Sequence, residues 1–403
     1  MEFQPGLRRD PLPDPEAVGE DEVLVERLRD EIRATEAITF ARFMERALYE
    51  PDHGYYRRAD PGPGRRGDFL TAPEAHPIFG AVLGRLVEQA WDALGRPDPF
   101  IVTEPGAGTG ALAAGLLGGL QDLASPLAGA IRYRPVEVEP ARLTALRTRL
   151  DALGVGGALV TDAPTPGSET GAIVANEVVD ALPVHRVIGR PAAADGLAEL
   201  FVAVDEAGWF VPREAPPSTP LLAERLAAEG VRLADGQVTE ICLALDGWLT
   251  EATRHLERGV VVLVDYADEP AALHDPARRP AGTLRAFAAH AVGADPFRHV
   301  GRQDLTATVD LAAVRSAAAR AGLEPLGETT QAELIATLGT GELTQAFLRR
   351  DGKGLQDALE LRSALARLLD PRGMGAFRVL AFGRGMPRGT RPAGLERLVP
   401  PAR

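Results

Sequence analysis

The stretch Phe100-Ile-Val-Thr-Glu-Pro-Gly-Ala-Gly-Thr-Gly-Ala111 limits the folds open to this chain more than any other segment. Its first residues are apolar and predict a short buried strand, and a helical apolar pattern begins at Ala111. Between them stand Glu104 and the glycines Gly106, Gly108 and Gly110. A strand, a glycine turn and a helix bring backbone N–H groups close to a ligand, and a side chain in the turn would block that approach. The spacing also satisfies a dinucleotide-binding pattern, so it does not identify the ligand by itself.

The acidic residue at the end of this strand favours one class of ligand. A dinucleotide would bring a pyrophosphate to the turn, where the carboxylate of Glu104 would repel it. S-adenosylmethionine has no phosphate and carries a sulfonium and an ammonium, which Glu104 would attract. At ~4 Å and an effective dielectric constant of about 20, one such pairing contributes on the order of 4 kcal/mol before desolvation is subtracted. We therefore predict a methyl donor, with a nicotinamide dinucleotide and a structural turn that binds nothing as the alternatives.

Acidic residues after the next two predicted strands support a nucleoside ligand. Residues 131–138 are predicted to form a second strand, and its Glu137 can accept hydrogen bonds from both ribose hydroxyls. Nicotinamide and methyl-donor cofactors share this arrangement, so it does not choose between them. Residues 157–161 predict a short strand that ends at Asp162. Asp162 is either a partner for the adenine amino group or a turn residue before Pro164.

A polar cluster follows the next buried strand. Asn176, Glu177 and Asp180 come directly after the apolar residues 172–175. In open α/β sheets, ligands lie outside the carboxyl ends of the strands, so we expect this cluster in the same crevice as the glycine turn. The apolar run 259–264 predicts another buried strand, which brings Asp265 to the same edge.

The alternation of strands and helices predicts an α/β fold with a Rossmann-like sheet, an N-terminal helical region and a helical insertion. Residues 49–73 hold aromatic side chains and the acid Asp68 in a turn-rich segment. They form either a surface loop or a flap over the ligand, with polar contacts from Asp68 and Thr71. The predicted divisions are a mobile leader (1–20), the helical region with the flap (21–97), the methyltransferase core in two parts (98–212 and 259–385), the helical insertion (213–258) and a tail (386–403).

Composition excludes several other classes of protein. The chain has 403 residues, a formal net charge of −13 and a single cysteine, Cys242. An acidic chain lacks the basic face that nucleic-acid binding needs, and one cysteine permits neither an internal disulfide nor a cysteine zinc cluster. The histidines show no pair at metal-ligand spacing, so we predict no metal. No apolar run approaches the ~20 residues of a membrane span, and no signal or transit peptide is recognisable. We therefore expect a cytoplasmic protein that contacts no membrane.

Several segments between about residues 35 and 385 carry a further signal when taken together. They are Ile38-Thr-Phe-x-x-Phe-Met44, Tyr49-x-Pro-x-x-Gly-Tyr-Tyr56, Gly67-Asp-Phe-x-Thr71, Glu104-x-Gly-x-Gly-x-Gly110, Val136-Glu-Val138, Asn176-Glu-x-x-Asp-Ala-Leu-Pro-Val184, Asp265-Tyr266, Gly282-Thr-Leu-Arg285 with His290, and Met374-Gly375. In this order they resemble the MidA family of S-adenosylmethionine-dependent methyltransferases, which belongs to the class I fold. The mitochondrial members of that family are complex I assembly factors acting as protein arginine methyltransferases.

The resemblance implies a role for each matching position. Residues expected to hold S-adenosylmethionine are Glu104, Gly106, Gly108, Gly110, Glu137, Asn176, Gly67 and Thr71, with Asp162 added from the strand pattern. Asp68 is expected to close over the site with Gly67 and Thr71, and Glu177 and Asp180 are expected to line it. Ala267 stands where the family usually has glycine after Asp-Tyr, beside the expected acceptor.

The expected reaction is methyl transfer to an arginine side chain of a protein. Carboxylates suit the planar guanidinium and can accept its proton, so Asp180, Glu177 and Asp68 are the catalytic candidates. One alternative is a methyltransferase for a small-molecule hydroxyl or carboxyl, with His185 or His290 as the base. Another is a non-catalytic assembly or scaffold protein that binds the cofactor for stability. The sequence leaves a homodimer open and does not specify the methyl acceptor.

Overall fold

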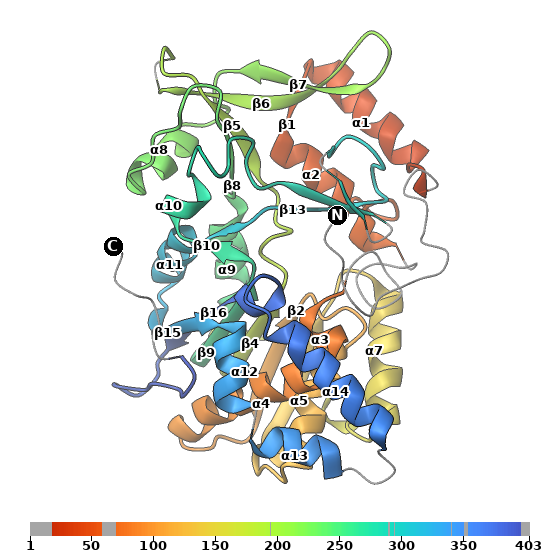
Figure 1. Ribbon diagram of the computed structural model, residues 1–403, viewed down its shortest axis with the longest axis vertical. Helices are drawn as coiled ribbons and strands as arrows, with labels where there is room; N and C mark the ends of the chain where they lie inside the picture. Colours follow the sequence, from red (N-terminus) through yellow and green to blue (C-terminus); the bar gives the residue numbers. More distant parts are fainter. Residues whose placement is uncertain are drawn as a thin grey trace. The chain divides into compact units, whose positions relative to one another are not determined.

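The computed structural model describes residues 18–58, 70–193, 195–288, 291–293, 295–339, 341–349 and 354–395 (Figure 1). Most of the predicted leader, and the predicted residues Gly67, Asp68 and His290, lie outside the described residues. The chain forms two compact units, each assembled from separated segments. The first unit combines Met1–Leu70, Pro183–Cys242 and His274–Ala307, and the second combines Thr71–Leu182, Leu243–Leu273 and Thr308–Arg403.

The second unit is built on a six-stranded sheet with the strand order β15-β16-β9-β4-β2-β3 (Figure 1). Neighbours among β9, β4, β2 and β3 are parallel, whereas β16 is antiparallel to both β9 and β15. This arrangement confirms the predicted α/β class with a Rossmann-like sheet. The strands are β2 (Phe100–Pro105), β3 (Ile131–Val136), β4 (Glu169–Asn176), β9 (Leu256–Asp265), β15 (Glu324–Thr330) and β16 (Arg378–Arg384).

The topology of this sheet has its switch point at β2. Strand β2 lies between β3 and β4, so the chain moves to one side of β2 and later returns to the other. Such a reversal leaves an opening beyond the carboxyl ends of the two diverging strands, where α/β proteins bind ligands. Strand β9 is buried from Gly259 to Asp265. Burial on both faces explains why its sequence is a continuous apolar run rather than an alternating one.

Helices α4 and α5 of the second unit pack unusually closely. A Cβ on Gly115 would lie 2.6 Å from the carbonyl oxygen of Pro77, and one on Gly119 would lie 2.4 Å from the Cβ of Ala81. Glycine is therefore required where these helices cross. The helices of this unit are α3 (Ala72–Ala75), α4 (Ile78–Ala93), α5 (Ala111–Asp122), α6 (Leu127–Ala130), α7 (Pro140–Ala152), α9 (Ala244–Thr253), α10 (Pro270–Leu273), α11 (Leu311–Arg320), α12 (Gln331–Leu338), α13 (Glu342–Arg349) and α14 (Leu355–Leu368).

The first unit contains a smaller antiparallel sheet and the N-terminal helices. The strand order is β1-β6-β5-β8, with β7 paired to β6, and a three-stranded sheet has the order β12-β11-β13. Its elements are α1 (Glu22–Thr35), β1 (Ile38–Thr39), α2 (Phe40–Tyr49), β5 (His185–Gly189), β6 (Leu197–Val204), β7 (Phe210–Ala215), α8 (Leu221–Ala228), β8 (Val238–Ile241), β11 (Arg285–Ala288), β12 (Ala291–Gly293) and β13 (Asp304–Thr306). The core packs the apolar faces of α1 and α2 around Phe40 and Phe43.

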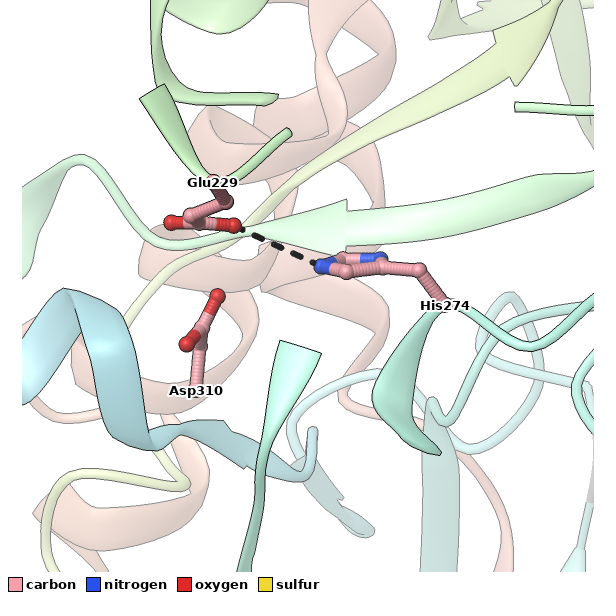
Figure 2. A group of neighbouring side chains, drawn as sticks. All are labelled: Glu229, His274 and Asp310. Carbon is pink, nitrogen blue, oxygen red and sulfur yellow. Dashed lines mark ion pairs between the residues drawn. The ribbon is translucent and has the colours of Figure 1, made fainter. Parts of the chain in front are cut away.

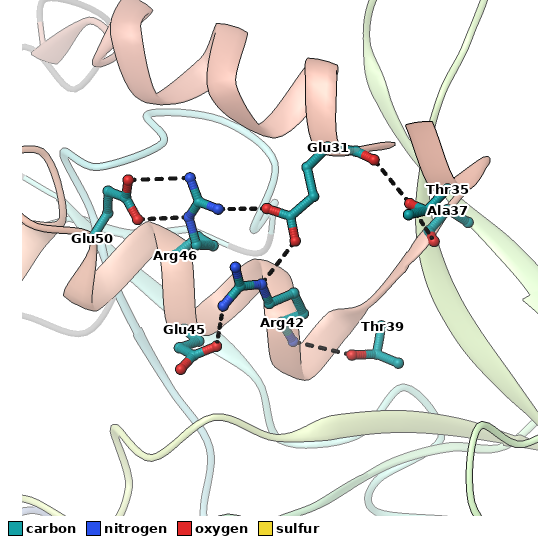
Figure 3. Close-up of polar contacts among 8 residues, drawn as sticks. All are labelled: Glu31, Thr35, Ala37, Thr39, Arg42, Glu45, Arg46 and Glu50. Atoms are coloured by element: carbon teal, nitrogen blue, oxygen red, sulfur yellow. Dashed lines mark hydrogen bonds and ion pairs between the residues drawn. The ribbon is translucent and has the colours of Figure 1, made fainter. Parts of the chain in front are cut away.

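Ion pairs connect α1 to α2 (Figure 3). Glu31 of α1 accepts from both Arg42 (2.8 Å) and Arg46 (2.5 Å) of α2. Arg42 also donates to Glu45, and Arg46 pairs with Glu50. Bonds to Glu31 and then Glu45 raise the pKa of the Arg42 guanidinium above its usual value. Arg42 and Arg46 therefore join α2 to α1, and the apolar faces of the two helices pack together in the core.

A buried histidine connects α8 to the third segment of the first unit (Figure 2). Nε2 of His274 lies 3.6 Å from Oε2 of Glu229, and its Nδ1 lies 2.9 Å from the hydroxyl of Thr239. Figure 2 also draws Asp310 of the second unit, which begins α11 by accepting from the N–H groups of Ala312 and Ala313.

Three sequence expectations differ from the structure. The insertion predicted as helical contains β8 and part of β7, because Val238–Ile241 is mostly β-branched and pairs with β5. Residues 183–212, expected in the catalytic core, join the N-terminal helices in the first unit, because β6 pairs with β1. The strand predicted at 157–161 is reduced to a 3-10 turn and a single bridge between Leu159 and Tyr133. Within the described ranges, no helix is both long and apolar enough to cross a membrane.

Candidate active site

The glycine turn after β2 uses its glycines for different reasons. Gly106, Gly108 and Gly110 all have positive φ, at 69°, 51° and 79°. A Cβ on Gly106 would lie 2.8 Å from the Val178 side chain, and one on Gly110 would lie 2.6 Å from that of Leu146, so both positions are closely packed. Within the described part of the chain, a Cβ on Gly108 would meet nothing within 4 Å. The described residues therefore leave the backbone of Gly108 uncovered, as a ligand-binding turn requires.

Glu104, expected to attract the cofactor through its carboxylate, is buried in the structure. It is 4% exposed, and its Oε2 accepts a 2.7 Å hydrogen bond from the hydroxyl of Tyr133 in β3. Burial raises the pKa of Glu104 to about 8; the bond from Tyr133 lowers it in part, and the charge of Glu137 raises it further. Without a ligand, Glu104 is therefore mostly protonated at neutral pH. A cation nearby would favour its ionised form.

Glu137 at the end of β3 binds the glycine turn directly. Its Oε2 accepts from the N–H of Gly108 at 2.9 Å, and its Oε1 accepts from the N–H groups of Val138 (2.9 Å) and Glu139 (3.1 Å). Arg142 also lies 3.6 Å from Oε1, and the side chain of Glu137 is only 4% exposed. A carboxylate has about four acceptor positions, so one position on Oε2 is left for a further donor. Val136 and Val138 beside it are exposed at 47% and 38%, which provides apolar surface next to the turn. The open face at Gly108, this carboxylate and the apolar surface fit an adenosine-containing cofactor.

Asn176 and Glu177 follow β4 in a constrained geometry. Glu177 has φ of 52°, a conformation that non-glycine residues rarely adopt. Its Oε1 accepts from the amide of Asn176 (2.9 Å) and from the N–H of Ala72 (3.2 Å). The other amide atom of Asn176, Oδ1, is buried and has no hydrogen-bond partner among the described residues. This strained, closely held segment has the character of a functional site rather than of a solvated loop.

Asp265 supports the same turn from the end of β9. Its Oδ2 accepts from the N–H groups of Val179 (2.9 Å) and Asp180 (3.3 Å), and its Oδ1 accepts from Tyr266 (2.8 Å). Burial raises the pKa of Asp265 to about 7, although the backbone hydrogen bonds oppose the rise. Asp180 itself is half-buried. Asp265 was not among the predicted site residues, although its position at the end of a predicted strand could have identified it.

The short helix α3 connects the two halves of the site. Thr71 precedes it, and the N–H of Ala72 reaches Glu177. Glu74 accepts from the hydroxyl of Thr109 in the glycine turn (3.1 Å) and from Arg149 (3.2 Å). Sequence reasoning also missed Glu74, because no pattern in the chain predicts a contact between these segments.

The structure thus brings together most of the predicted residues of the second unit. Glu104, Glu137 and the glycines form one connected group, Thr71, Asn176, Glu177 and Asp180 form another, and α3 joins them. Asp162 is exposed, and its carbonyl oxygen accepts from Arg134. Its contact with adenine stays a prediction, as do the cofactor and catalytic roles of the other residues. In the first unit, Nδ1 of His185 lies 2.7 Å from the buried carboxylate of Glu199.

Comparison with known proteins is consistent with this geometry. Residues 82–329 match a family described as "Putative S-adenosyl-L-methionine-dependent methyltransferase". A crystal structure from Burkholderia thailandensis bound to S-adenosyl-homocysteine is 35% identical, with a TM-score of 0.82, covering 96% of this chain and 98% of that one. The mitochondrial protein arginine methyltransferase NDUFAF7 of Mus musculus is 28% identical, covering 87% of this chain and 82% of that protein. The Homo sapiens protein is 24% identical, with 87% and 81% covered.

Proposed function

The chain belongs to the S-adenosylmethionine-dependent methyltransferases, and we propose that it methylates an arginine side chain of a protein. S-adenosylmethionine is its cofactor, since the similar Burkholderia thailandensis structure holds S-adenosyl-homocysteine. Arginine is supported by the relatives named protein arginine methyltransferases, which are 24–28% identical to this chain. It is supported independently by the chemistry of the residues that follow β4.

The observation that carries the proposal is the carboxylate pair Glu177 and Asp180 on a turn with fixed geometry. A guanidinium is planar and permanently charged, and carboxylates held in place can bind it through paired hydrogen bonds. Glu177 is fixed by Asn176 and by the N–H of Ala72, and the turn carrying Asp180 is fixed by Asp265. Residues so constrained lose little conformational entropy when a substrate binds.

The chain contributes mainly orientation to the reaction. The cofactor, when bound, supplies a methyl group on a sulfonium, and the departing sulfur keeps the electrons of the broken S–C bond. Glu177 and Asp180 would hold the guanidinium so that one nitrogen faces the methyl group as the N–C bond forms. Asp180 would accept the N–H proton of that nitrogen. Glu137, which itself accepts from the N–H of Gly108, would hold the adenosine end in place beside the glycine turn.

Substitution of Asp180 tests the proposal. Asp180→Asn should reduce transfer of labelled methyl into lysate proteins at least about a hundredfold, the usual scale for a lost acid–base group. Calorimetric affinity for S-adenosylhomocysteine should change little, because Asp180 lies outside the connected group at the glycine turn. Asp92→Asn is a matched control, since Asp92 forms a surface ion pair with the exposed Arg96 in the same unit. Wild-type transfer by Asp180→Asn would remove this residue from the mechanism.

A small-molecule acceptor is the second candidate, and the pair His185–Glu199 favours it. Glu199 is fully buried and accepts from His185 and from the N–H of Ser218. Burial raises its pKa, but these hydrogen bonds lower it further, so the pKa is below its usual value. An ionised carboxylate of this kind orients a histidine as a base. Label recovered in a small-molecule extract, and lost in His185→Asn, would favour this function, whereas no transfer at all would favour a scaffold protein.

A further inference from the structure

Asp265 is a buried carboxyl group whose two oxygens accept hydrogen bonds from backbone N–H groups. Only 3% of the residue is exposed. The N–H groups of Val179, Asp180 and Tyr266 donate to it, and the N–H of Val178 contributes a further bond. Consecutive N–H groups that converge on one anion form a nest, a backbone geometry that binds negative charge. In this protein, the nest is filled by the carboxyl group of Asp265, a side chain from the neighbouring strand β9.

The pairing of β4 with β9 explains why this carboxylate meets that turn. Asn176 lies opposite Val264, and the N–H of Glu177 extends the ladder by donating to the carbonyl of Val264 at 2.8 Å. The chain then turns over the end of β9, where Asp265 is the next residue. Glu177 has φ of 52° at this point. Such a conformation persists only when surrounding contacts hold it, and the bonds to Asp265 are the ones that close this turn.

We infer that Asp265 is a positioning residue for methyl transfer, which holds the turn Val178–Asp180 and so sets the places of Glu177 and Asp180. This inference rests on the proposed roles of Glu177 and Asp180. Both oxygens of Asp265 accept from backbone N–H groups, so it acts through the turn and is not assigned a contact with the substrate. The hydrogen bond from the N–H of Gly108 to Glu137 does not involve Asp265. Cofactor affinity should therefore depend only weakly on Asp265.

Asp265→Asn tests the inference, because the amide group places N–H donors among backbone donors and removes at least one acceptor. At saturating S-adenosylmethionine, the rate of label transfer into lysate proteins should fall at least about tenfold, since a misplacement of about 1 Å can cost about a hundredfold. The affinity for S-adenosylhomocysteine should stay within about threefold, because the contacts at the glycine turn remain. This split between rate and affinity is not expected from a general loss of stability.

Asp310→Asn is the matched control. Asp310 also accepts from backbone N–H groups, those of Ala312 and Ala313, and asparagine replaces aspartate well at the start of a helix. We expect its transfer rate to equal that of the wild type. An unchanged rate in folded Asp265→Asn would overturn the inference, as would equal losses of rate and of S-adenosylhomocysteine affinity.

Two further measurements do not depend on the folding of Asp265→Asn. In the wild type, the N–H groups of Val179 and Asp180 should exchange with deuterium as slowly as those inside β4 and β9, and fast exchange would overturn the inference. Formate added to Asp265→Ala should restore part of the transfer rate by filling the nest, whereas chloride should not. Failure of the proposed function has a different signature, because Asp180→Asn would then remain active.

Discussion

Glu104 should link the binding of S-adenosylmethionine to the release of a proton. Burial raises the pKa of this carboxyl to about 8, with Tyr133 opposing and Glu137 adding to the rise. A group with that pKa is about 90% protonated at pH 7. A sulfonium and an ammonium favour the ionised form, so the bound ligand should lower the pKa and expel the proton.

The expected magnitude follows from this pKa. The ionised fraction of a carboxyl with a pKa of about 8 rises from about 1% at pH 6 to about 24% at pH 7.5. If the ionised form is the one that binds the cation tightly, affinity should increase about 24-fold over this interval. The interval ends below about 7.7–8.0, where the amino group of the ligand itself titrates. Calorimetry in two buffers of different ionisation enthalpy should also count about 0.9 protons released per ligand at pH 7.

Glu104→Gln is the perturbation that isolates this effect. Glutamine keeps the shape and can still accept from Tyr133, but it carries no charge, so proton release and the pH dependence of affinity should both disappear. Stability gives a second readout: a raised pKa means that the native state binds more protons than the unfolded state between about 4.5 and 8. Wild-type stability should therefore fall as pH rises through this window. The variant should show a shallower fall, because Asp265, with its pKa raised to about 7, adds a slope of the same sign. A wild-type affinity that varies less than about threefold, or equally in the variant, would refute the reasoning.

Two glycine substitutions with matched controls give further predictions. Gly108→Ala and Gly154→Ala place a Cβ in open space at φ of 51° and 73°, so each should lower the free energy of unfolding by about 1–2 kcal/mol. Calorimetry should then show that only Gly108→Ala loses affinity for S-adenosylmethionine, and equal affinities would contradict a ligand at this turn. Gly119→Ala places its Cβ 2.4 Å from that of Ala81, whereas Gly129→Ala meets nothing within 4 Å. Denaturant unfolding should show a loss of about 1–3 kcal/mol for Gly119→Ala alone, and a similar loss in both would exclude overpacking as the cause.

The elements of the second unit could be predicted from sequence because local patterns determine them. The glycine turn, Glu137 and the cluster after β4 each follow a strand, and a parallel sheet brings such positions to one edge. Contacts between side chains of neighbouring strands could not be predicted in the same way. Tyr133 reaches Glu104 only because of the register between β2 and β3, and that register is a property of the assembled sheet. The sequence pattern does not reveal that Glu104 is buried. The prediction of a methyl donor therefore assumed an ionised Glu104, whereas burial leaves it mostly neutral.

The first unit was predicted less well for a related reason. Its sheet joins β1 to β6, and the paired residues Ile38 and Val202 are more than 150 residues apart in the sequence. Three of the four residues of β8 are β-branched and favour a strand, but a run of four is too short to be assigned from its pattern alone, and its pairing with β5 is a property of the assembled sheet. Glu74 shows the same limit at the site, since its contact with Thr109 depends on the packing of α3 against α5.

The interleaving of the two units has a consequence for biosynthesis. The smaller sheet needs β1 from the beginning of the chain and β8 from its middle, and the larger sheet needs β16, which ends at Arg384. A growing polypeptide on the ribosome therefore holds β1 without its partner until Val204 has emerged, and holds β9 with one edge open until Arg384 has emerged. Unpaired strand edges of this kind promote aggregation during synthesis. Chaperones should therefore matter most for this protein while these edges are unpaired.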